Sequence, residues 1–521
     1  MNDITAKIFP MSAEYRDYLH DETKTVGRAD SISFPQTEED IRALLRRCAE
    51  EKTPVTVQGN RTGLTAGAVP DGGHIMSLSK MDQVLGMRLG EDDTVYLRVQ
   101  PGLSLGVLRQ MIAAKSFPTT GWDEASLAAY ERFRRLPAQY FPPDPTETSA
   151  SIGGMVSCNS SGAKTYHYGA TRPYIQALRL VLADGDVLRI ARGENVARGR
   201  DFSFTTESGR VISGRLPGYT MPRCKNASGY YAEDDMDLLD LFVGADGTLG
   251  VLSEIELRLI PMPQIIWGVN CFFRSEATAL DFVEAVGESC PAVVAVEYFD
   301  SRALDILRGH DDGACPVPTG FDCMIYVELH AEEESLAAGQ IKALGALLER
   351  LGADSGETWA ARSQPDRERL LTLRHKVPES VNALIARRKR EIPGLAKVGS
   401  DMAVPDAAFR ACMAMYHRDL AAEGLEYAVW GHIGNRHLHV NVLPRSAEEM
   451  LRGKEMFVRW AQQIVAMGGT VSAEHGTGKI KTNLLQILYG EQGLREMAAV
   501  KRAFDPGCRL SPGNLFPADY V

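Results

Sequence analysis

A short segment, AVWGHIGNRHLHVNV at residues 428–442, places three imidazole side chains within eight residues. His432, His437 and His439 are three of only 11 histidines in a chain of 521 residues. Imidazole is a common metal ligand, and its charge changes close to neutral pH. The segment is therefore a candidate for metal binding or proton transfer.

The spacing of these histidines suits a β-hairpin. With a turn at Asn435-Arg436, His432 lies opposite His439 and Gly434 lies opposite His437. Opposed residues share one face of the ladder, with Cβ atoms about 4.5–5.5 Å apart. Two imidazoles so placed can reach one metal ion at about 2.0–2.1 Å. The hairpin therefore predicts a ligand pair, His432 and His439.

A catalytic metal usually has a third protein ligand and an open position. The segment VSAEHGTGK offers Glu474, with His475 next to it. Strand alternation also places Asn441 on the same face as His437 and His439. The spacing alone leaves a second interpretation open, in which these histidines are partly exposed strand residues with backbone partners.

Strands and helices alternate around the hairpin. Runs such as IIWGVNCFF, AVVAVEYFD and CMIYVELHA predict strands, and EATALDFVEAVGES and SAEEMLRGKEMFVRWAQQIVAMGG have helical spacing. Beyond a proline-containing boundary at 261–268, this pattern predicts an α+β domain with a mostly antiparallel sheet. In the N-terminal half, residues 35–52 predict a helix with Thr37 as its N-cap, and residues 190–225 predict a polar surface excursion.

Composition limits the partners and the compartment. The net charge of −11 argues against nucleic acid as a partner, and the basic cluster at 387–390 is interpreted as a solvated helix face. No apolar run approaches the ~18 residues of a membrane span, so we expect no transmembrane segment. Nine cysteines without a C-x-x-C pair argue against a thiolate-bound cluster and indicate reduced thiols. We expect a cytoplasmic protein, with any membrane association peripheral and at the inner face.

Three glycine-bearing loops, each beside a predicted strand, could hold phosphate: residues 59–67, 149–162 and 244–250. The first has the spacing G-x-x-x-G-x-x-x-G, which is not the dinucleotide fingerprint G-x-G-x-x-G. Glycine lets a backbone approach a pyrophosphate closely, and turn N–H groups can form an anion site. One such loop is more often a plain turn, but three together indicate a large phosphate-bearing cofactor.

These loops belong to an ordered set of motifs that resembles a known family. VTVQGNRTGLTAGAVP, FPPDPTETSASIGGMVSCNSSG, KNASGYY, FVGADGTLGVLSEIELRLIP and FDPGCRLSPGNLFP occur in that order. They look like the FAD-binding domain of the vanillyl-alcohol oxidase/PCMH flavoprotein superfamily, and in particular its FAD-linked D-2-hydroxyacid dehydrogenase branch. The resemblance covers residues ~20 to 519. It implies a two-subdomain PCMH-type FAD-binding domain at 1–260, an α+β cap domain at 261–470 for the substrate, and a C-terminal segment at 471–521 that returns to the FAD domain.

The resemblance implies that the three loops hold a non-covalent FAD, with the pyrophosphate on the first, the flavin and ribityl against the second, and the adenosine along the third. The implied contacts are Gly59, Asn60, Arg61, Thr62, Gly63, Leu64, Gly67, Pro143, Asp144, Ser149, Ser151, Gly153, Gly154, Asn159, Gly162, Gly244, Gly247, Thr248, Gly250 and Ile255. The first loop departs from the family, because Asn60 and Arg61 stand where small residues are common. Residues ~118 to 140 look like an insertion, whose predicted helix could cover the active site or mediate assembly.

The family also carries the patterns GH-x-G-x-x-x-LH-x-N and S-x-EHG, which this chain matches. By resemblance, His432, His439 and Glu474 bind one divalent metal, and His475 is the catalytic base. We expect zinc, with manganese or iron as alternatives for histidine and carboxylate ligands. His437 stands where the family often has a small polar residue, and could support a ligand, contact the substrate or add a ligand.

Arg374 in LLTLRHKV resembles the family's substrate arginine, and a guanidinium can bind a carboxylate through two hydrogen bonds. Lys397 matches the family's catalytic lysine less well, because the family lysine lies about two residues nearer the following proline. Asn441 and His475 complete the implied substrate contacts.

The implied reaction is oxidation of a D-2-hydroxy acid to the 2-oxo acid, with hydride transfer to flavin N5. The metal would act as a Lewis acid on the hydroxyl oxygen, and His475 would take the proton. We expect D-lactate as substrate, with D-2-hydroxyglutarate and glycolate as alternatives. A dicarboxylate needs a second cation, for which the candidates are Arg362, Lys376 and Lys397. The acceptor would be an electron-transfer flavoprotein, a quinone or a cytochrome rather than oxygen, and assembly as a homodimer is left open.

Two other classes of protein stay open on the same fold. One is a transferase similar to alkyl-dihydroxyacetonephosphate synthase, whose branch is marked by a histidine tract and a tyrosine acid and lacks this hairpin. The other is a flavin-containing electron-transfer subunit without a substrate site, against which Arg374, the metal set and His475 argue.

Overall fold

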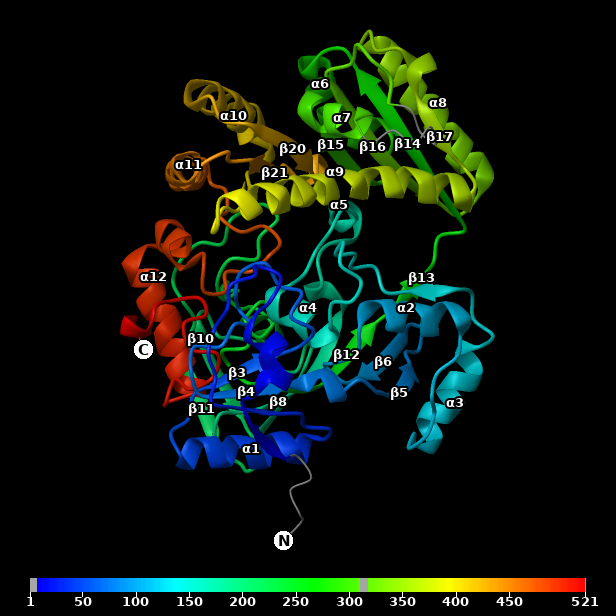
Figure 1. The fold of residues 1–521 in the computed structure, drawn as a ribbon. Coiled ribbons are helices and arrows are strands. Elements are labelled where there is room, and N and C mark those ends of the chain that lie inside the picture. Colours follow the sequence, from blue (N-terminus) through cyan, green and yellow to red (C-terminus); the bar gives the residue numbers. More distant parts are fainter. Residues whose placement is uncertain (1–6, 310–316, 521) are drawn as a thin grey trace.

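The histidine segment belongs to an eight-stranded sheet in the upper part of the molecule (Figure 1). The computed structural model describes residues 7–309 and 317–520. The strand order is β17-β14-β16-β15-β20-β21-β18, with β19 also paired to β21, and all these pairs are antiparallel. The strands are β14 (Ile265–Phe273), β15 (Val293–Phe299), β16 (Cys323–Ala331), β17 (Trp359–Ala361), β18 (Val398–Gly399), β19 (Met402–Ala403), β20 (Tyr427–Gly431) and β21 (His437–Val442).

Strand alternation gives this sheet one apolar face and one polar face. On β15, Val296 and Tyr298 point into an apolar core, so the buried Glu297 between them points to the other side. On β21, Leu438 and Val440 enter the same core. The alternate residues His437 and His439 therefore lie on the same face of the sheet as Glu297. The apolar face is covered by α6 (Glu276–Ser289), α8 (Glu334–Arg350), α10 (Phe409–Glu423) and α11 (Ala447–Ala466).

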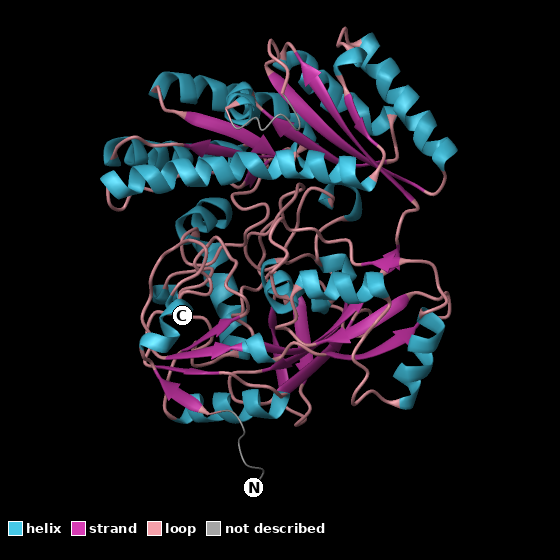
Figure 2. Ribbon diagram, turned by 45° about the vertical axis from the view of Figure 1, so that its right-hand side comes forward, coloured by secondary structure: helices cyan, strands magenta, loops and turns pink. Residues whose placement is uncertain are grey.

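The long helix α9 (Gln364–Glu391) runs between the eight-stranded sheet and the lower part of the molecule (Figure 2). Its Leu373 and Val377 pack in a small core with α7 (Ser301–Arg308). The basic cluster at 387–390 forms the last turn of this helix, as expected for a helix face. Cations are favourable there because the carbonyl end of a helix carries partial negative charge.

Two further sheets and a hairpin form the lower part of the molecule. A five-stranded antiparallel sheet has the order β5-β6-β12-β8-β9, and a four-stranded sheet has the order β1-β2-β4-β3. Their strands are β1 (Ile8–Pro10), β2 (Ser31–Ser33), β3 (Val55–Gln58), β4 (His74–Ser77), β5 (Val84–Leu89), β6 (Val95–Val99), β8 (Ile175–Val181), β9 (Val187–Ala191) and β12 (Val251–Arg258). The helices that lie among them are α1 (Glu38–Glu50), α2 (Leu105–Ala114), α4 (Ile152–Cys158) and α5 (Thr165–Tyr168).

Helix α1 shows how directly local sequence sets one element. The Thr37 side chain accepts the N–H of Asp40, and the Asp40 carboxylate accepts the N–H of Thr37 in return. This capping box satisfies two N–H groups that a helix start would otherwise leave free. Ile41, Leu44 and Leu45 form the buried stripe, so the helix expected at 35–52 and its N-cap are confirmed.

The prediction of a polar surface excursion at 190–225 is wrong. This segment contains a two-stranded hairpin, β10 (Asp201–Thr205) and β11 (Val211–Arg215). Phe202 and Phe204 point inward and pack on Phe504 of the C-terminal helix α12 (Thr482–Phe504). Exposed and buried residues alternate along β10, so the polar residues that suggested a surface loop are the outer half of a strand.

The inserted segment at 118–140 forms α3 (Glu124–Phe133), with Asp123 as N-cap. Phe133 is fully buried, and α3 packs on β5 at the outer edge of the five-stranded sheet. Figures 1 and 2 both show α3 on the opposite side of the molecule from β21. The insertion therefore does not lie over the histidines.

The chain crosses from the lower to the upper part between β13 (Ile260–Pro261) and β14. β13 pairs with β7 (Gln139–Tyr140) just before this crossing. The C-terminal helix α12 packs against β11 in the lower part and against α11 in the upper part. The division of the chain at 260 and 470 stays a prediction. Among the described helices, none combines the length and apolar character needed to cross a membrane.

Candidate active site between the hairpin and the glycine loops

The hairpin has a different register from the one predicted. Strands β20 and β21 pair Trp430 with His439, so His432 does not lie opposite His439 in the ladder. A 3-10 turn at Ile433–Asn435 follows His432, and Arg436 closes it with a φ of 53°. This longer turn still folds the ring of His432 back to 5.5 Å from the ring of His439, measured between centroids.

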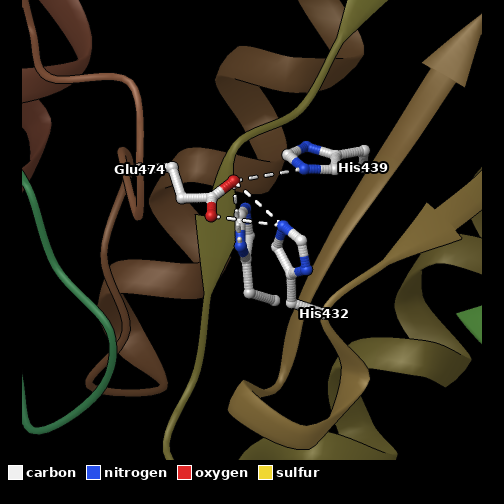
Figure 3. Close-up of side chains that lie close together, drawn as sticks. His432, His439 and Glu474 are labelled. Carbon is white, nitrogen blue, oxygen red and sulfur yellow. Dashed lines mark hydrogen bonds and ion pairs between the residues drawn. The ribbon is translucent and has the colours of Figure 1, made fainter. Parts of the chain in front are cut away.

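Glu474 joins the histidines of the hairpin from the loop between α11 and α12 (Figure 3). Its Oε2 atom lies 3.2 Å from His432 Nε2, 3.4 Å from His439 Nε2 and 3.9 Å from His437 Nδ1. One potential ligand atom from each of the four residues lies within 4.8 Å of the others. These four residues could close on one divalent cation with small side-chain movements, since metal–ligand distances are about 2.0–2.2 Å.

His432 is held through its second ring nitrogen. Its Nδ1 lies 2.6 Å from Glu297 Oε1, and Arg374 donates to the other Glu297 oxygen at 2.9 Å. Metal-bound histidines usually donate their second N–H to such a carboxylate. Burial opposes a charge on His432, but the Glu297 and Glu474 carboxylates outweigh it and raise the pKa of His432 to about 9.

His437 provides the test of whether these residues fit a metal. The side chain is fully buried, and no described residue is a hydrogen-bond partner of its Nδ1. Burial lowers the pKa of His437 to about 3, so the ring is neutral. A buried unpaired nitrogen costs free energy unless something binds it. Three imidazoles and a carboxylate suit zinc, manganese or iron, so the donor set fits a divalent metal.

Asp401 connects the hairpin to the segment that carries Glu474. Its Oδ1 lies 3.0 Å from His437 Nε2, and its Oδ2 lies 3.3 Å from His475 Nδ1 and 2.6 Å from Lys481 Nζ. The backbone N–H groups of Glu474 and His475 donate to the same carboxylate at 3.2 and 3.1 Å. Burial works against the charge on Asp401, but the surrounding cations and donors hold its pKa well below the usual range.

His475 lies next to this cluster, with its ring stacked on His439 at 5.6 Å between centroids. Its side chain is 27% exposed, whereas Asp401 is 2% exposed. Because Asp401 faces Nδ1, Nε2 is the ring nitrogen directed away from that carboxylate. Burial lowers the pKa of His475 to about 4, so the ring is neutral at pH 7 and can accept a proton.

The three other substrate candidates come from separate elements. The Arg374 guanidinium, from the middle of α9, lies 5.2 Å from the Tyr326 ring centroid. Asn441 is buried and donates to the His439 carbonyl at 2.9 Å, so it supports the strand of that histidine. Lys397 lies just before β18, where the residue is exposed to solvent.

The first glycine loop leaves a row of backbone donors free. Within the described residues, no atom accepts a hydrogen bond from the N–H groups of residues 60–64. Consecutive free N–H groups form an anion site of the kind that binds phosphate. A Cβ on Gly59 would lie 2.1 Å from Ser151 Oγ, so the first and second loops touch here because position 59 has no side chain. The loop therefore fits the pyrophosphate of FAD.

The remaining residues of this loop have other contacts. Asn60 donates to the Ser149 carbonyl at 2.6 Å, and Arg61 lies over the Tyr18 ring at 4.3 Å. Leu64 is 46% exposed. The chain at Thr62, Gly63 and Gly67 is at least partly accessible.

The second loop is shaped by close backbone contacts. Ser151 caps α4 by accepting the N–H of Gly154 at 3.2 Å. A Cβ at position 153 would meet Pro101 at 2.6 Å, and one at position 162 would meet the Asp144 carbonyl oxygen at 2.0 Å. Burial raises the pKa of Asp144, whose carboxylate accepts the N–H of Lys164. Of the other predicted residues, Asn159 ends α4 with a φ of 50° and Pro143 accepts a hydrogen bond from Arg109.

The third loop is joined to α4 by backbone hydrogen bonds from Gly244 to Val156 and from Asp246 to Ser157. Positive φ values of 94° at Gly244 and 70° at Gly247 explain why glycine occupies both positions. Thr248 and Ile255 lie fully inside the protein: Thr248 bonds Tyr230 and Ala245, and Ile255 pairs with Val99 and Leu178 in the sheet. Gly250 packs closely against Leu180. For these residues the expected FAD contacts stay predictions.

Sequence reasoning missed three residues of this site: Asp401, Glu297 and Lys225. Lys225 lies in KNASGYY, a segment that resembles the family, and Asp401 follows Lys397 by four residues in the sequence, but neither carried an assigned role. Glu297 is the polar residue within the apolar strand AVVAVEYF, and a buried acid in such a strand is a signal of function.

Comparisons with known proteins agree with this architecture. Residues 263–515 match the family described as FAD linked oxidases, C-terminal domain, and residues 29–123 and 125–191 match the family described as FAD binding domain. The chain is 25% identical to glycolate oxidase subunit GlcD of Bacillus subtilis, covering 94% of this chain and 89% of that protein. It is 27% identical to the mitochondrial D-lactate dehydrogenase [cytochrome] of Arabidopsis thaliana (95% and 74% covered) and 27% identical to D-2-hydroxyglutarate dehydrogenase of Stutzerimonas stutzeri (96% and 94% covered).

A solved structure shows the same fold at low sequence identity. The 4-ethylphenol oxidase from Gulosibacter chungangensis superposes with a TM-score of 0.61 at 16% identity, covering 98% of this chain and 94% of that one. The FAD-binding and oxidase C-terminal matches together span most of the described residues. Residues of the two matched regions are in contact where Ser161 donates to Glu474 and Thr65 donates to the His475 carbonyl. The chain therefore belongs to the family of FAD-linked oxidases with a PCMH-type FAD-binding domain.

Proposed function

We propose that this oxidoreductase converts a D-2-hydroxy acid to the 2-oxo acid with the help of a divalent metal. The first substrate candidate is D-lactate, and the electrons pass to an acceptor other than oxygen. The observation that carries the proposal is the convergence of Glu474 Oε2 on three histidine nitrogens at 3.2–3.9 Å. A neutral His475 lies next to that point. A flavin electron-transfer subunit would have no need of such a site.

FAD and a divalent metal would supply two kinds of chemistry. The flavin of bound FAD accepts a hydride, and a divalent cation held by His432, His439 and Glu474 makes a hydroxyl more acidic. We expect His437 to add to this set or to orient it, because its Nδ1 faces the same carboxylate oxygen.

His475 is the proton acceptor in this proposal. Removing a proton from the substrate hydroxyl requires a base that is unprotonated at the working pH and within hydrogen-bond reach. His475 meets the first requirement because burial lowers its pKa to about 4. Asp401 contacts its Nδ1 and so fixes which ring nitrogen faces the substrate.

Arg374 binds the substrate carboxylate in this proposal. It donates one hydrogen bond to Glu297 through a terminal nitrogen, and no other described residue accepts a hydrogen bond from its guanidinium. The remaining donors form the planar fork that matches a carboxylate. Its side chain is 13% exposed, so water competes little with that contact.

The charges on the polar face of the sheet favour a monocarboxylate. Arg362, one candidate second cation, follows β17 and pairs with Glu334 at the surface. β17 and β21 are five strand spacings apart, and neighbouring strands are about 4.8 Å apart. Arg362, which follows β17 directly, therefore lies roughly 24 Å from β21 across the sheet. Glu297 and Glu328 are buried carboxylates on adjacent strands that already pair with Arg374 and Lys164, so these cations are partly neutralised before a second substrate carboxylate could bind.

The names of the relatives support the substrate class and one type of acceptor. They include a glycolate oxidase subunit, a D-2-hydroxyglutarate dehydrogenase and a D-lactate dehydrogenase whose name specifies cytochrome. We therefore place a cytochrome first among the proposed acceptors of this chain, ahead of a quinone or an electron-transfer flavoprotein.

Anaerobic bleaching of the flavin visible band tests the proposal. D-lactate, L-lactate, D-2-hydroxyglutarate and glycolate are added in turn to the FAD-loaded protein, before and after chelator treatment. We expect bleaching by D-lactate and not by L-lactate, loss of bleaching with chelator, and recovery when zinc or manganese is returned. Persistence of the oxidised spectrum with every acid, although FAD and metal are bound, would exclude the proposed function.

A further inference from the structure

Glu474 is also held from outside the hairpin, by Lys225 and by Ser161 of the predicted flavin loop. Lys225 Nζ donates to Glu474 Oε1 at 2.6 Å, and Ser161 Oγ donates to the same oxygen at 3.3 Å. His432 Nε2 lies 3.2 Å from both oxygens, whereas His439 Nε2 and His437 Nδ1 face Oε2. The orientation of this carboxylate is therefore fixed by residues outside the hairpin.

Lys225 also reaches the loop predicted to hold the flavin. Its ammonium donates to the Gly162 carbonyl at 3.2 Å, while its side chain is only 3% exposed. The Gly162 carbonyl and the Glu474 carboxylate are the described acceptors of this buried ammonium, and a buried donor that loses an acceptor costs free energy. Movement of residue 162 would therefore disturb Lys225, and through it Glu474.

The backbone around Lys225 is joined to the same segment. Ala227 N–H donates to the Ser472 carbonyl at 2.8 Å, and Ser472 N–H donates to Ser228 Oγ at 3.1 Å. These bonds lie two residues before Glu474. These bonds hold the segment after Lys225 beside the segment that carries Glu474.

The first glycine loop makes an independent connection on the other side of Glu474. The Thr65 carbonyl accepts the N–H groups of Lys479 and Ile480 at 2.9 and 3.3 Å, and Thr65 Oγ donates to the His475 carbonyl at 3.2 Å. This loop is the one whose free N–H groups fit the pyrophosphate. Both predicted FAD loops therefore contact the segment that carries Glu474 and His475.

We propose that Lys225 is a positioning residue that ties the flavin-binding loop to the metal-binding carboxylate of Glu474, so that FAD and the divalent metal bind cooperatively. The inference rests on the metal site of the proposed function. FAD that fixes the Gly162 loop also fixes Lys225 and the orientation of Glu474, which raises metal affinity. By thermodynamic linkage, metal then raises FAD affinity by the same factor.

The test measures FAD release from the purified holoenzyme with and without zinc. The chelator-treated protein is diluted in buffer with or without a zinc excess, and free FAD is followed by its fluorescence to equilibrium. We expect zinc to lower the FAD dissociation constant by about 5- to 150-fold, the usual range for coupled sites. In Lys225→Met we expect both ligands to bind but the zinc effect on the FAD dissociation constant to fall by at least about threefold, with a remainder carried by Ser161 and Thr65.

Two further variants keep the result interpretable. Ser161→Ala removes the weaker bond to Glu474 without removing a charge, and we expect a partial loss of the zinc effect. Lys115→Met removes a lysine contact with the Leu136 carbonyl in the lower part of the molecule, away from the flavin loop, and should keep the full effect. A spectral shift of the flavin on zinc addition, present in wild type and lost in Lys225→Met, is the second readout.

The outcomes separate this inference from the proposed function. Zinc that binds to wild type without changing FAD affinity overturns the coupling and leaves the metal-assisted reaction intact. An equal zinc effect in wild type, Lys225→Met and Lys115→Met overturns the role of Lys225. Absence of zinc, manganese and iron binding to the holoenzyme overturns both.

Discussion

Nε2 of the fully buried His437 lies 3.0 Å from Oδ1 of Asp401. The second oxygen of this carboxylate lies 3.3 Å from Nδ1 of His475. One buried acid therefore orients a candidate metal ligand and the candidate base together. The roles of Asp401 and His437 can be separated by substitution, because one change should affect kcat and the other metal affinity.

Asp401→Asn tests the positioning of the base. The amide keeps the size of the side chain but presents an NH2 group to one of the two imidazoles, which disturbs their tautomers. A positioned base contributes typically 10²–10⁴-fold, so we expect kcat to fall by about 10² or more, with FAD content unchanged. Steady-state kinetics and the flavin spectrum are the measurements. A kcat within threefold of wild type would show that His475 needs no help from Asp401.

His437→Asn tests whether the fourth histidine contributes to metal binding. Loss of a ligand, or of a group that supports one, typically lowers affinity or activity by about 10- to 100-fold. We expect zinc affinity to fall by that amount in competition with a chromophoric chelator, while FAD remains bound. Asn435→Ala, in the adjacent turn, is the control. Unchanged affinity would mean that His437 acts only through Asp401.

Arg374→Lys tests recognition of the substrate carboxylate. Lysine keeps the charge but loses the planar fork, and a hydrogen bond to a charged group contributes about 1.5–3 kcal/mol. We therefore expect kcat/KM for D-lactate to fall by roughly 10- to 150-fold. Arg369→Lys, at an exposed position on the same helix, should leave kcat/KM unchanged. If both variants behave alike, the carboxylate is bound elsewhere.

How far the sequence could predict this site depended on whether the signal was local. Thr37 and Asp40 lie in one turn, so the capping box was predictable. The register of the histidine hairpin was not, because a 3-10 turn and a positive φ at Arg436 shift the pairing without altering the composition of the strands. His432 and His439 still meet, since the longer turn folds back over the same face.

Contacts between distant segments could not be predicted from a single sequence. Lys225 and Glu474 are 249 residues apart, and Glu297 and His432 are 135 residues apart, yet each pair is in direct contact. No local periodicity encodes such pairs. The hairpin β10–β11 was missed for a related reason, because Phe202 and Phe204 are buried by Phe504, near the other end of the chain.

Asp300→Asn tests a pH effect on stability away from the active site. Asp300 caps α7 by accepting the N–H of Ala303, and burial raises its pKa to about 7. In the unfolded chain the usual value is about 3.9. Between these values the folded state binds more protons, so this group makes the free energy of unfolding fall as pH rises from about 4 to 7. The full effect at higher pH is about 4 kcal/mol, at 1.36 kcal/mol per pH unit.

Asparagine caps a helix equally well and cannot ionise, so we expect the variant to be more stable than wild type at pH 8 and about equal at pH 4. Urea unfolding at both pH values is the measurement, with the exposed Asp305→Asn on the same helix as control. Equal stability of Asp300→Asn and wild type at pH 8 would show that the Asp300 carboxylate is solvated in the folded protein.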